Sequence, residues 1–180
     1  MTALFDGLTA GTWMLDPAHT AASFSVRHAG ISKTRGQFDQ VKGSLTAADS
    51  LESLRVEATL DVASIDTGNE DRDNHLRSGD FFDAETYPEI RFVSTSVTKD
   101  SMVGELTIRD TTREVTLDLT FEGAATDPFG TYRAGFSAST EISRKDFGLT
   151  WNAALEAGGV LVGDKVTITI EAEFTAPASA

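Results

Sequence analysis

Apolar and polar residues alternate with a period of two along most of this 180-residue chain. Because successive side chains of a strand point to opposite faces, this pattern is typical of strands with one buried face. Short polar connections permit antiparallel neighbours but not crossover helices. The sequence therefore predicts an all-β fold, either a closed barrel or a sandwich. The alternation is clearest in residues 54–62, 114–121, 132–142 and 166–174, and weaker in residues 22–27, 41–46, 90–97 and 102–109.

One polar segment, residues 66–82, interrupts the alternation and is the best helix candidate in the chain. Thr67 followed by Glu70 fits a capping box, and Gly79 suits the C-terminal end of a helix. Acidic residues near its start and Arg77 near its end agree with the helix dipole. The polarity of the segment favours a helix packed beside the sheet rather than in the core.

Small residues recur at positions that the alternation turns inward: Ala58, Gly104, Ala134, Ala138 and Ala172. A barrel of about eight strands is either filled by its own side chains or holds one small ligand. Two interpretations therefore stay open. The small residues leave a cavity, or they offset Phe side chains on facing strands. A cavity lined by such strands would be apolar and would suit a lipid.

The net charge of −13 argues against a nucleic-acid partner, because phosphate binding needs a cationic surface. The start of the chain lacks the pattern of a signal peptide, and no apolar run is long enough to span a membrane. We therefore expect a cytoplasmic protein, or a periplasmic or secreted one if a leader was removed. We expect one domain over residues 12–175 with a helical insert at about 67–83, an N-terminal arm (1–11) and a flexible tail (176–180).

One stretch, residues 17–38, contains no acidic residue although the chain is strongly acidic. It carries Arg27, Lys33 and Arg35 as well as two histidines. Two interpretations stay open here: these cations bind an anionic head group, or they pair with acids elsewhere in the fold.

The three histidines, His19, His28 and His75, have no metal-ligand spacing, so we expect no metal site and no cofactor. A Gly-x-Ser-x-Gly nucleophile elbow is absent from the sequence, and Ser78 near His75 is not a known nucleophile setting. We therefore do not expect an enzyme.

Several motifs, in order along the chain, resemble the YceI-like family. The match extends from about residue 12 to residue 174, and the combination of motifs is specific although each motif alone is weak. The matching segments are Trp13, residues 15–20, 24–28 and 35–38, the insert motifs at 64–68, 72–78 and 80–83, and residues 104–109, 112–115 and 144–148.

The resemblance implies an eight-stranded antiparallel lipocalin-like barrel with a helix beside it, often in a homodimer. It implies a cavity that binds long amphiphiles such as polyisoprenoids, and some relatives are linked with isoprenoid quinones and stress response. The matching positions expected near the mouth of the cavity are His28, Arg35, Phe38, His75 and Phe82.

Three functions follow as hypotheses. The first is binding, sequestration or transport of an isoprenoid or other long-chain lipid. The second is a stress-response interaction protein with a filled barrel. The third is a hydrolase-type enzyme that uses His75 and a nearby acid.

Overall fold

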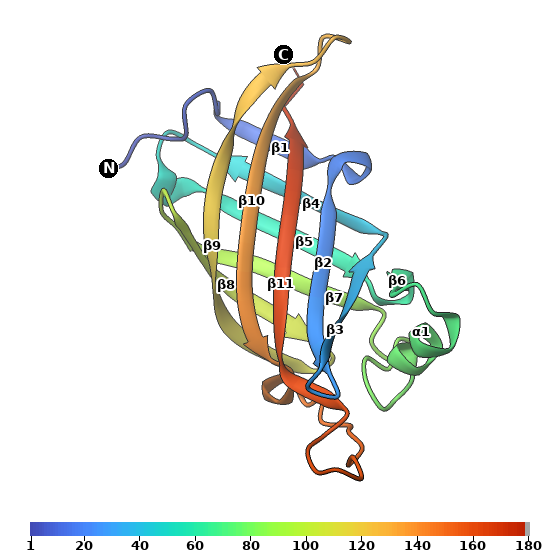
Figure 1. The fold of residues 1–180 in the computed structure, drawn as a ribbon. Coiled ribbons are helices and arrows are strands. Elements are labelled where there is room, and N and C mark those ends of the chain that lie inside the picture. The colour runs from blue at the N-terminus through green and yellow to red at the C-terminus, as the bar shows by residue number, and fades with distance from the viewer. Residues whose placement is uncertain (179–180) are drawn as a thin grey trace.

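The computed structural model describes residues 1–178, which form a single antiparallel sheet of eleven strands and one α-helix (Figure 1). The helix is α1 (Glu70–Arg77), and four short 3-10 turns are η1 (Pro17–His19), η2 (Leu51–Ser53), η3 (Val62–Ser64) and η4 (Arg144–Phe147). The strands are β1 (Gly11–Leu15), β2 (Ala21–His28), β3 (Ser32–Phe38), β4 (Val41–Ala47), β5 (Arg55–Asp61), β6 (Ile65–Asp66), β7 (Glu89–Val97), β8 (Ser101–Ile108), β9 (Thr111–Thr126), β10 (Tyr132–Ser143) and β11 (Val162–Thr175).

Eight of these strands close into a barrel in the order β1-β4-β5-β7-β8-β9-β10-β11. The closing contact is short: Met14 of β1 pairs with Thr175 of β11, and Leu15 pairs with Phe174. The predicted eight-stranded antiparallel barrel is therefore confirmed, and the sandwich alternative is wrong. Within the described residues, no helix has the length and apolarity needed to cross a membrane.

The β2–β3 hairpin continues the wall of the barrel beyond β1. β2 pairs with β11 from Val162 to Glu171, so β1 and β2 share the same edge of β11. The outer strand of the hairpin, β3, pairs with the short strand β6 through Gln37–Asp66 and Phe38–Ile65. This pairing brings the start of the helical insert to the edge of the hairpin (Figure 1).

The predicted helix is confirmed, but its predicted cap is wrong. Asn69 is the N-cap, and its side-chain oxygen accepts a hydrogen bond of 2.9 Å from the backbone N–H of Arg72. Thr67 lies outside the helix, where its hydroxyl and its backbone N–H both donate to the buried carboxylate of Asp73, at 2.5 and 2.9 Å. Thr67 therefore anchors the helix from the side and does not begin it.

The insert packs beside the barrel, as its polarity predicted. Arg77 donates to the backbone carbonyl oxygens of Ala63 and Ile65, at 3.0 and 3.1 Å. Gly36 of β3 makes a close approach possible, because a Cβ there would lie 2.4 Å from the ring of Phe24 and 2.8 Å from Cγ2 of Thr67. The insert is thus joined to the barrel by backbone carbonyls and by one glycine that leaves room for it.

Both ends of the described chain lie at the other end of the barrel, away from the β10–β11 connection (Figure 1). In the N-terminal arm, Phe5 stacks on Phe121 with ring centroids 4.9 Å apart, and the hydroxyl of Tyr132 donates to the carbonyl oxygen of Gly7. Ala176 donates its N–H to the carbonyl oxygen of Tyr132. The predicted tail therefore starts with a residue bonded to the barrel, and its residues 179–180 lie outside the described part of the chain.

The Asp73 anchor gives a test of how the insert is held. Asp73→Ala leaves the Thr67 N–H and hydroxyl without their acceptor, so we expect the free energy of unfolding to fall by about 1–3 kcal/mol in a denaturant titration. Asp71→Ala is the matched control, because Asp71 is exposed on the same helix. It should cost less than about 0.5 kcal/mol. Equal losses in the two variants would contradict the anchoring role.

Candidate ligand-binding cavity

A cavity of about 260 Å³ lies inside the barrel. Its lining extends from Phe5 of the N-terminal arm to Leu149 and Val162 near the opposite end. Of the described residues that line it, four have polar side chains, and the others are aliphatic or aromatic. The four are Thr20, Ser23, Thr140 and Arg144.

The small inward residues create this space only in part. Ala58, Ala138 and Ala172 line the cavity. Ala134 instead lies fully buried in the apolar cluster that packs around Trp13 and Phe5. Gly104 makes room for a ring, because a Cβ there would lie 2.4 Å from the ring of Phe92. Both interpretations of the small residues are therefore correct, each for different positions.

Two segments cover the end of the cavity opposite the arm. Leu76, Phe81 and Phe82 of the insert line it from one side, and Leu149 of the β10–β11 connection (residues 148–161) lines it from the other. The two covers touch each other through Trp151, whose ring centroid lies 4.6 Å from that of His75 and 5.4 Å from that of Phe81. The insert, which was predicted to pack beside the sheet, therefore also forms one side of the cavity.

Arg144 places a buried positive charge at this end of the cavity. Its guanidinium donates to the backbone carbonyl oxygens of four residues of the β10–β11 connection and the start of β11, at 2.7–3.2 Å: Leu149, Trp151, Val162 and Gly163. Burial lowers the pKa of Arg144, and the nearby carboxylate of Asp164 opposes that shift. Arg144 therefore holds the β10–β11 connection in place through hydrogen bonds to backbone carbonyl oxygens. Because these acceptors are neutral, the positive charge of the guanidinium is not cancelled by them and remains beside the apolar cavity.

The structure brings together two of the five predicted site residues. Phe38 and Phe82 both line the cavity, and their rings meet edge to face at 5.9 Å. His28 is exposed at the end of β2, and Arg35 is exposed opposite Ser25 on β3. Neither His28 nor Arg35 lines the cavity. A ligand-binding role for each of the five residues stays a prediction.

His75, the fifth predicted residue, lies between the insert and the β10–β11 connection and is not among the residues that line the cavity. Its Nε2 is 2.9 Å from Oδ2 of Asp80, so an imidazole–carboxylate pair exists. The nearby hydroxyl of Ser78 donates to the backbone carbonyl oxygen of His75 at 2.6 Å, so it caps the helix end and does not contact the imidazole. The geometry supports a packing role for this histidine.

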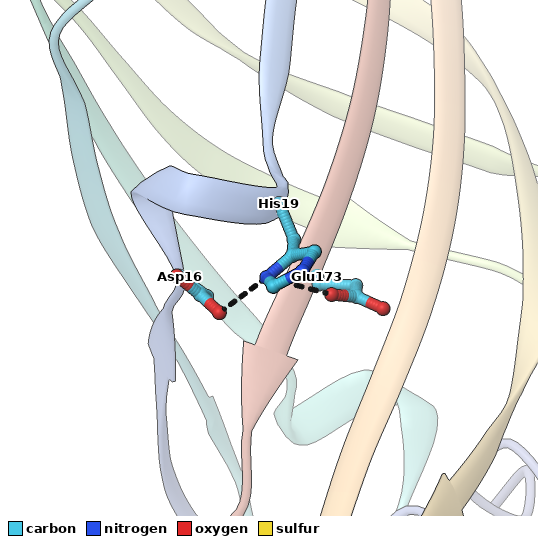
Figure 2. A group of neighbouring side chains, drawn as sticks. All are labelled: Asp16, His19 and Glu173. Carbon is cyan, nitrogen blue, oxygen red and sulfur yellow. Dashed lines mark hydrogen bonds and ion pairs between the residues drawn. The ribbon is translucent and has the colours of Figure 1, made fainter. Parts of the chain in front are cut away.

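A second polar cluster, made of Asp16, His19 and Glu173, joins η1 to β11 (Figure 2). Nδ1 of His19 lies 2.9 Å from Oδ2 of Asp16 and 3.6 Å from Oε2 of Glu173. One imidazole nitrogen and two carboxylates form a donor set that suits Zn²⁺. Arg133 already supplies a fixed positive charge here, since its Nη1 lies 2.5 Å from Asp16 Oδ2 and 3.7 Å from Glu173 Oε2. The cluster therefore fits an ion-pair junction better than a metal site.

This junction strongly favours the ionised form of Asp16. Hydrogen bonds from His19 and Arg133 lower the pKa of the Asp16 carboxyl to about 2. Arg133 also bonds Asp127 through Nε at 2.8 Å, and that bond lowers the pKa of Asp127. The side chain of Arg133 thus links the end of β1 to the β9–β10 turn.

Sequence reasoning missed three residues of the site: Phe5, Arg144 and Trp151. Phe5 and Trp151 reach the cavity or its covers from segments without alternation, so no periodic signal marks them. Arg144 could have been found, because it is a cation directly after an alternating apolar strand, at a position that a strand end would bury.

Comparison with known proteins assigns the chain to a family. The model of the YceI-like domain matches residues 13–174, which is most of the chain. This chain belongs to the YceI-like family. A UPF0312 protein of Staphylococcus aureus (strain MSSA476), SAS2572, is 39% identical over 165 residues, which cover 89% of this chain and 95% of that protein. The resemblance seen in the sequence motifs is therefore confirmed.

Solved structures share the barrel. Burkholderia cenocepacia BcnA superposes with a TM-score of 0.75 at 23% identity, covering 88% of this chain and 98% of BcnA. A polyisoprenoid-binding domain from Saccharophagus degradans, implicated in plant cell wall breakdown, superposes with a TM-score of 0.69 at 15% identity, covering 92% of this chain and 98% of that domain. At these identities the two likenesses show the fold.

The lowered pKa of Asp16 predicts acid sensitivity. A carboxyl whose pKa is lower in the folded state stabilises the protein above its unfolded pKa, and this contribution is lost as the pH falls. We expect wild type to exceed Asp16→Asn in unfolding free energy by about 1–2 kcal/mol at pH 7, and this difference to disappear between about pH 4 and pH 2. Denaturant titrations at several pH values measure it.

The control for this prediction is Asp49→Asn, at an exposed turn position. It should change the unfolding free energy by less than about 0.5 kcal/mol. An advantage of wild type over Asp16→Asn that grows as the pH falls from 4 to 2 would refute the assigned sign.

Proposed function

We propose that this protein binds a long-chain amphiphilic lipid, such as a polyisoprenoid or an isoprenoid quinone, in its barrel cavity, for sequestration or transport. The observation that carries the proposal is the apolar cavity inside the barrel, which has four polar lining residues. The polyisoprenoid-binding domain of Saccharophagus degradans supports it, because that domain has the same fold.

The size and chemistry of the cavity suit one hydrocarbon chain segment. Small-molecule sites usually have volumes of roughly 300–1,000 Å³, and this cavity of about 260 Å³ lies just below that range. Each buried methylene contributes about 0.8 kcal/mol, so a segment of about ten carbons would gain roughly 8 kcal/mol before the cost of association. Apolar contact therefore supplies a gain comparable with the cost of association.

We assign the chain and the head of the ligand to different residues. Phe38 and Phe82 would contact the chain, because both rings face the cavity. Arg144 would favour a polar or anionic head at its end of the cavity. His28, Arg35 and His75 would contact only a part of the ligand that extends beyond the apolar space.

Binding fits this geometry better than catalysis. The His75–Asp80 pair lies outside the cavity lining, and its imidazole is packed against Phe81 and Trp151.

We further propose a cytoplasmic homodimer with a role in stress response. Cell fractionation and light scattering test the location and the dimer.

A cavity-filling variant tests lipid binding. Ala138→Phe places a ring in the cavity, so we expect native mass spectrometry to show at least tenfold less bound lipid than in wild type after incubation with a polyprenyl phosphate. Ala125→Phe is the matched control, because Ala125 is exposed on β9. It should bind lipid as wild type does.

Two results would contradict the proposal. Wild type that retains no lipid, either from the cell or after incubation, would favour an interaction protein whose barrel holds no ligand. Equal lipid binding by Ala138→Phe and wild type would place the lipid outside the barrel.

A further inference from the structure

Two exposed apolar side chains lie at the tips of neighbouring loops. Ile31, in the turn between β2 and β3, is 83% exposed, and Val160, in the β10–β11 connection, is 52% exposed. Figure 1 shows both loops at the same end of the molecule, away from the two termini. The N–H of Ala29 donates to the carbonyl oxygen of Leu161 at 2.7 Å, so the two loops are joined. We call this surface the loop end, comprising residues 27–35 and 155–163.

The loop end also carries the cations of the acid-free stretch. Arg27 and Lys33 are directly opposite each other on the β2–β3 hairpin, and Arg35 is one outward position further along β3. All three residues are exposed. None of the three has an ion-pair partner within 4 Å among residues 1–178. The interpretation that they pair with acids elsewhere is therefore wrong for the described part of the chain.

The arrangement of these cations has a cost. Like charges directly opposite each other on paired strands destabilise the sheet. Arg27 and Lys33 therefore do not stabilise the hairpin by pairing with each other, and an external anion between them would relieve their repulsion. Glu156 is the acidic residue among the connection residues of the loop end, so the hairpin keeps a local excess of positive charge.

The loop end adjoins the cavity. Val26, next to Arg27, lines the cavity from β2. Val162, two residues after Val160, lines it from β11 and pairs with His28. A surface held by the loop end would therefore lie close to this wall of the cavity.

We propose that the loop end docks the protein on an anionic lipid bilayer. Ile31 and Val160 enter the boundary between head groups and acyl chains, while Arg27, Lys33 and Arg35 contact the phosphates. Charge complementarity selects this partner, because the cations are gathered at one end of a chain whose net charge is −13. The acidic remainder is repelled by the same bilayer, so the protein docks in one orientation.

This docking goes beyond lipid binding in the cavity and can be tested apart from it. Sedimentation with vesicles of phosphatidylcholine and phosphatidylglycerol, free of isoprenoids, measures docking alone. We expect wild type to bind these vesicles, to bind phosphatidylcholine vesicles at least tenfold more weakly, and to lose affinity as salt rises.

Variants at the loop end should weaken vesicle binding by set amounts. Each basic residue near an anionic surface is worth about fivefold in affinity, so Arg27→Gln with Lys33→Gln should weaken binding by about 25-fold. Ile31→Asp should weaken it by at least about tenfold. Circular dichroism checks that each variant is folded.

Matched controls lie elsewhere on the barrel. Phe129→Asp changes a side chain that is 92% exposed in the β9–β10 turn, at the opposite end of the molecule (Figure 1). Lys42→Gln removes an exposed cation from β4. Both should bind vesicles as wild type does.

Three results would overturn docking. The first is that wild type does not bind the anionic vesicles, and the second is that the control variants lose as much affinity as the loop-end variants. The third is that Ile31→Asp converts a dimer to a monomer without a change in vesicle binding, which would make the loop end an interface between copies of the chain. Wild type that binds these vesicles but retains no lipid after incubation with a polyprenyl phosphate would overturn only the proposed function.

Discussion

The structure depends on how the sheet closes. β1 reaches β11 through two residue pairs only, and the chain then turns away at Asp16 and returns as β2 on the same edge. At this turn the short strand β1 is succeeded by the longer strand β2 as the neighbour of β11. The ion pairs of Asp16 with His19 and Arg133 hold the turn in place. Because β1 ends there, the β2–β3 hairpin continues the barrel wall along the rest of β11. The outer edge of this hairpin is β3, and the short strand β6, at the start of the insert, pairs with its last two residues.

The hollow interior follows from the same closure. Eight strands set a diameter that side chains can just fill, so the size of a few inward residues decides between a core and a cavity. Around Trp13 and Phe5 the rings fill the space and seal one end. Nearer the middle, Ala58, Ala138 and Ala172 leave it open. Arg144 can stay buried beside this apolar space because backbone carbonyls, rather than an acid, satisfy its guanidinium.

Local patterns predicted what is local. Alternation located seven of the eight barrel strands and β2, but it missed β1 and β3. Polarity located α1 beside the sheet rather than inside it. The cap was misassigned because Thr67 and Asn69 both have capping side chains, and only the fold shows that Thr67 is used by Asp73. The choice between barrel and sandwich, and the meeting of Asp16 with Glu173, depend on contacts between distant residues, which periodicity cannot report. The site was half predictable for the same reason: Phe38 and Phe82 follow from motifs, whereas Trp151 is placed by the connection.

The closing pairs also set the order in which the molecule can assemble. Met14 must find Thr175, and the hydroxyl of Tyr132 must find Gly7, across most of the chain. Contacts so distant in sequence form slowly, because the loop between them loses entropy before the pairing gives any return. During synthesis β1 can pair with β4, and the β2–β3 and β4–β5 hairpins and those from β7 to β10 can form as they emerge. The second edge of β1 must wait for β11. Until then the future cavity is an exposed apolar trough, and newly made chains meet their greatest risk of aggregation at that stage.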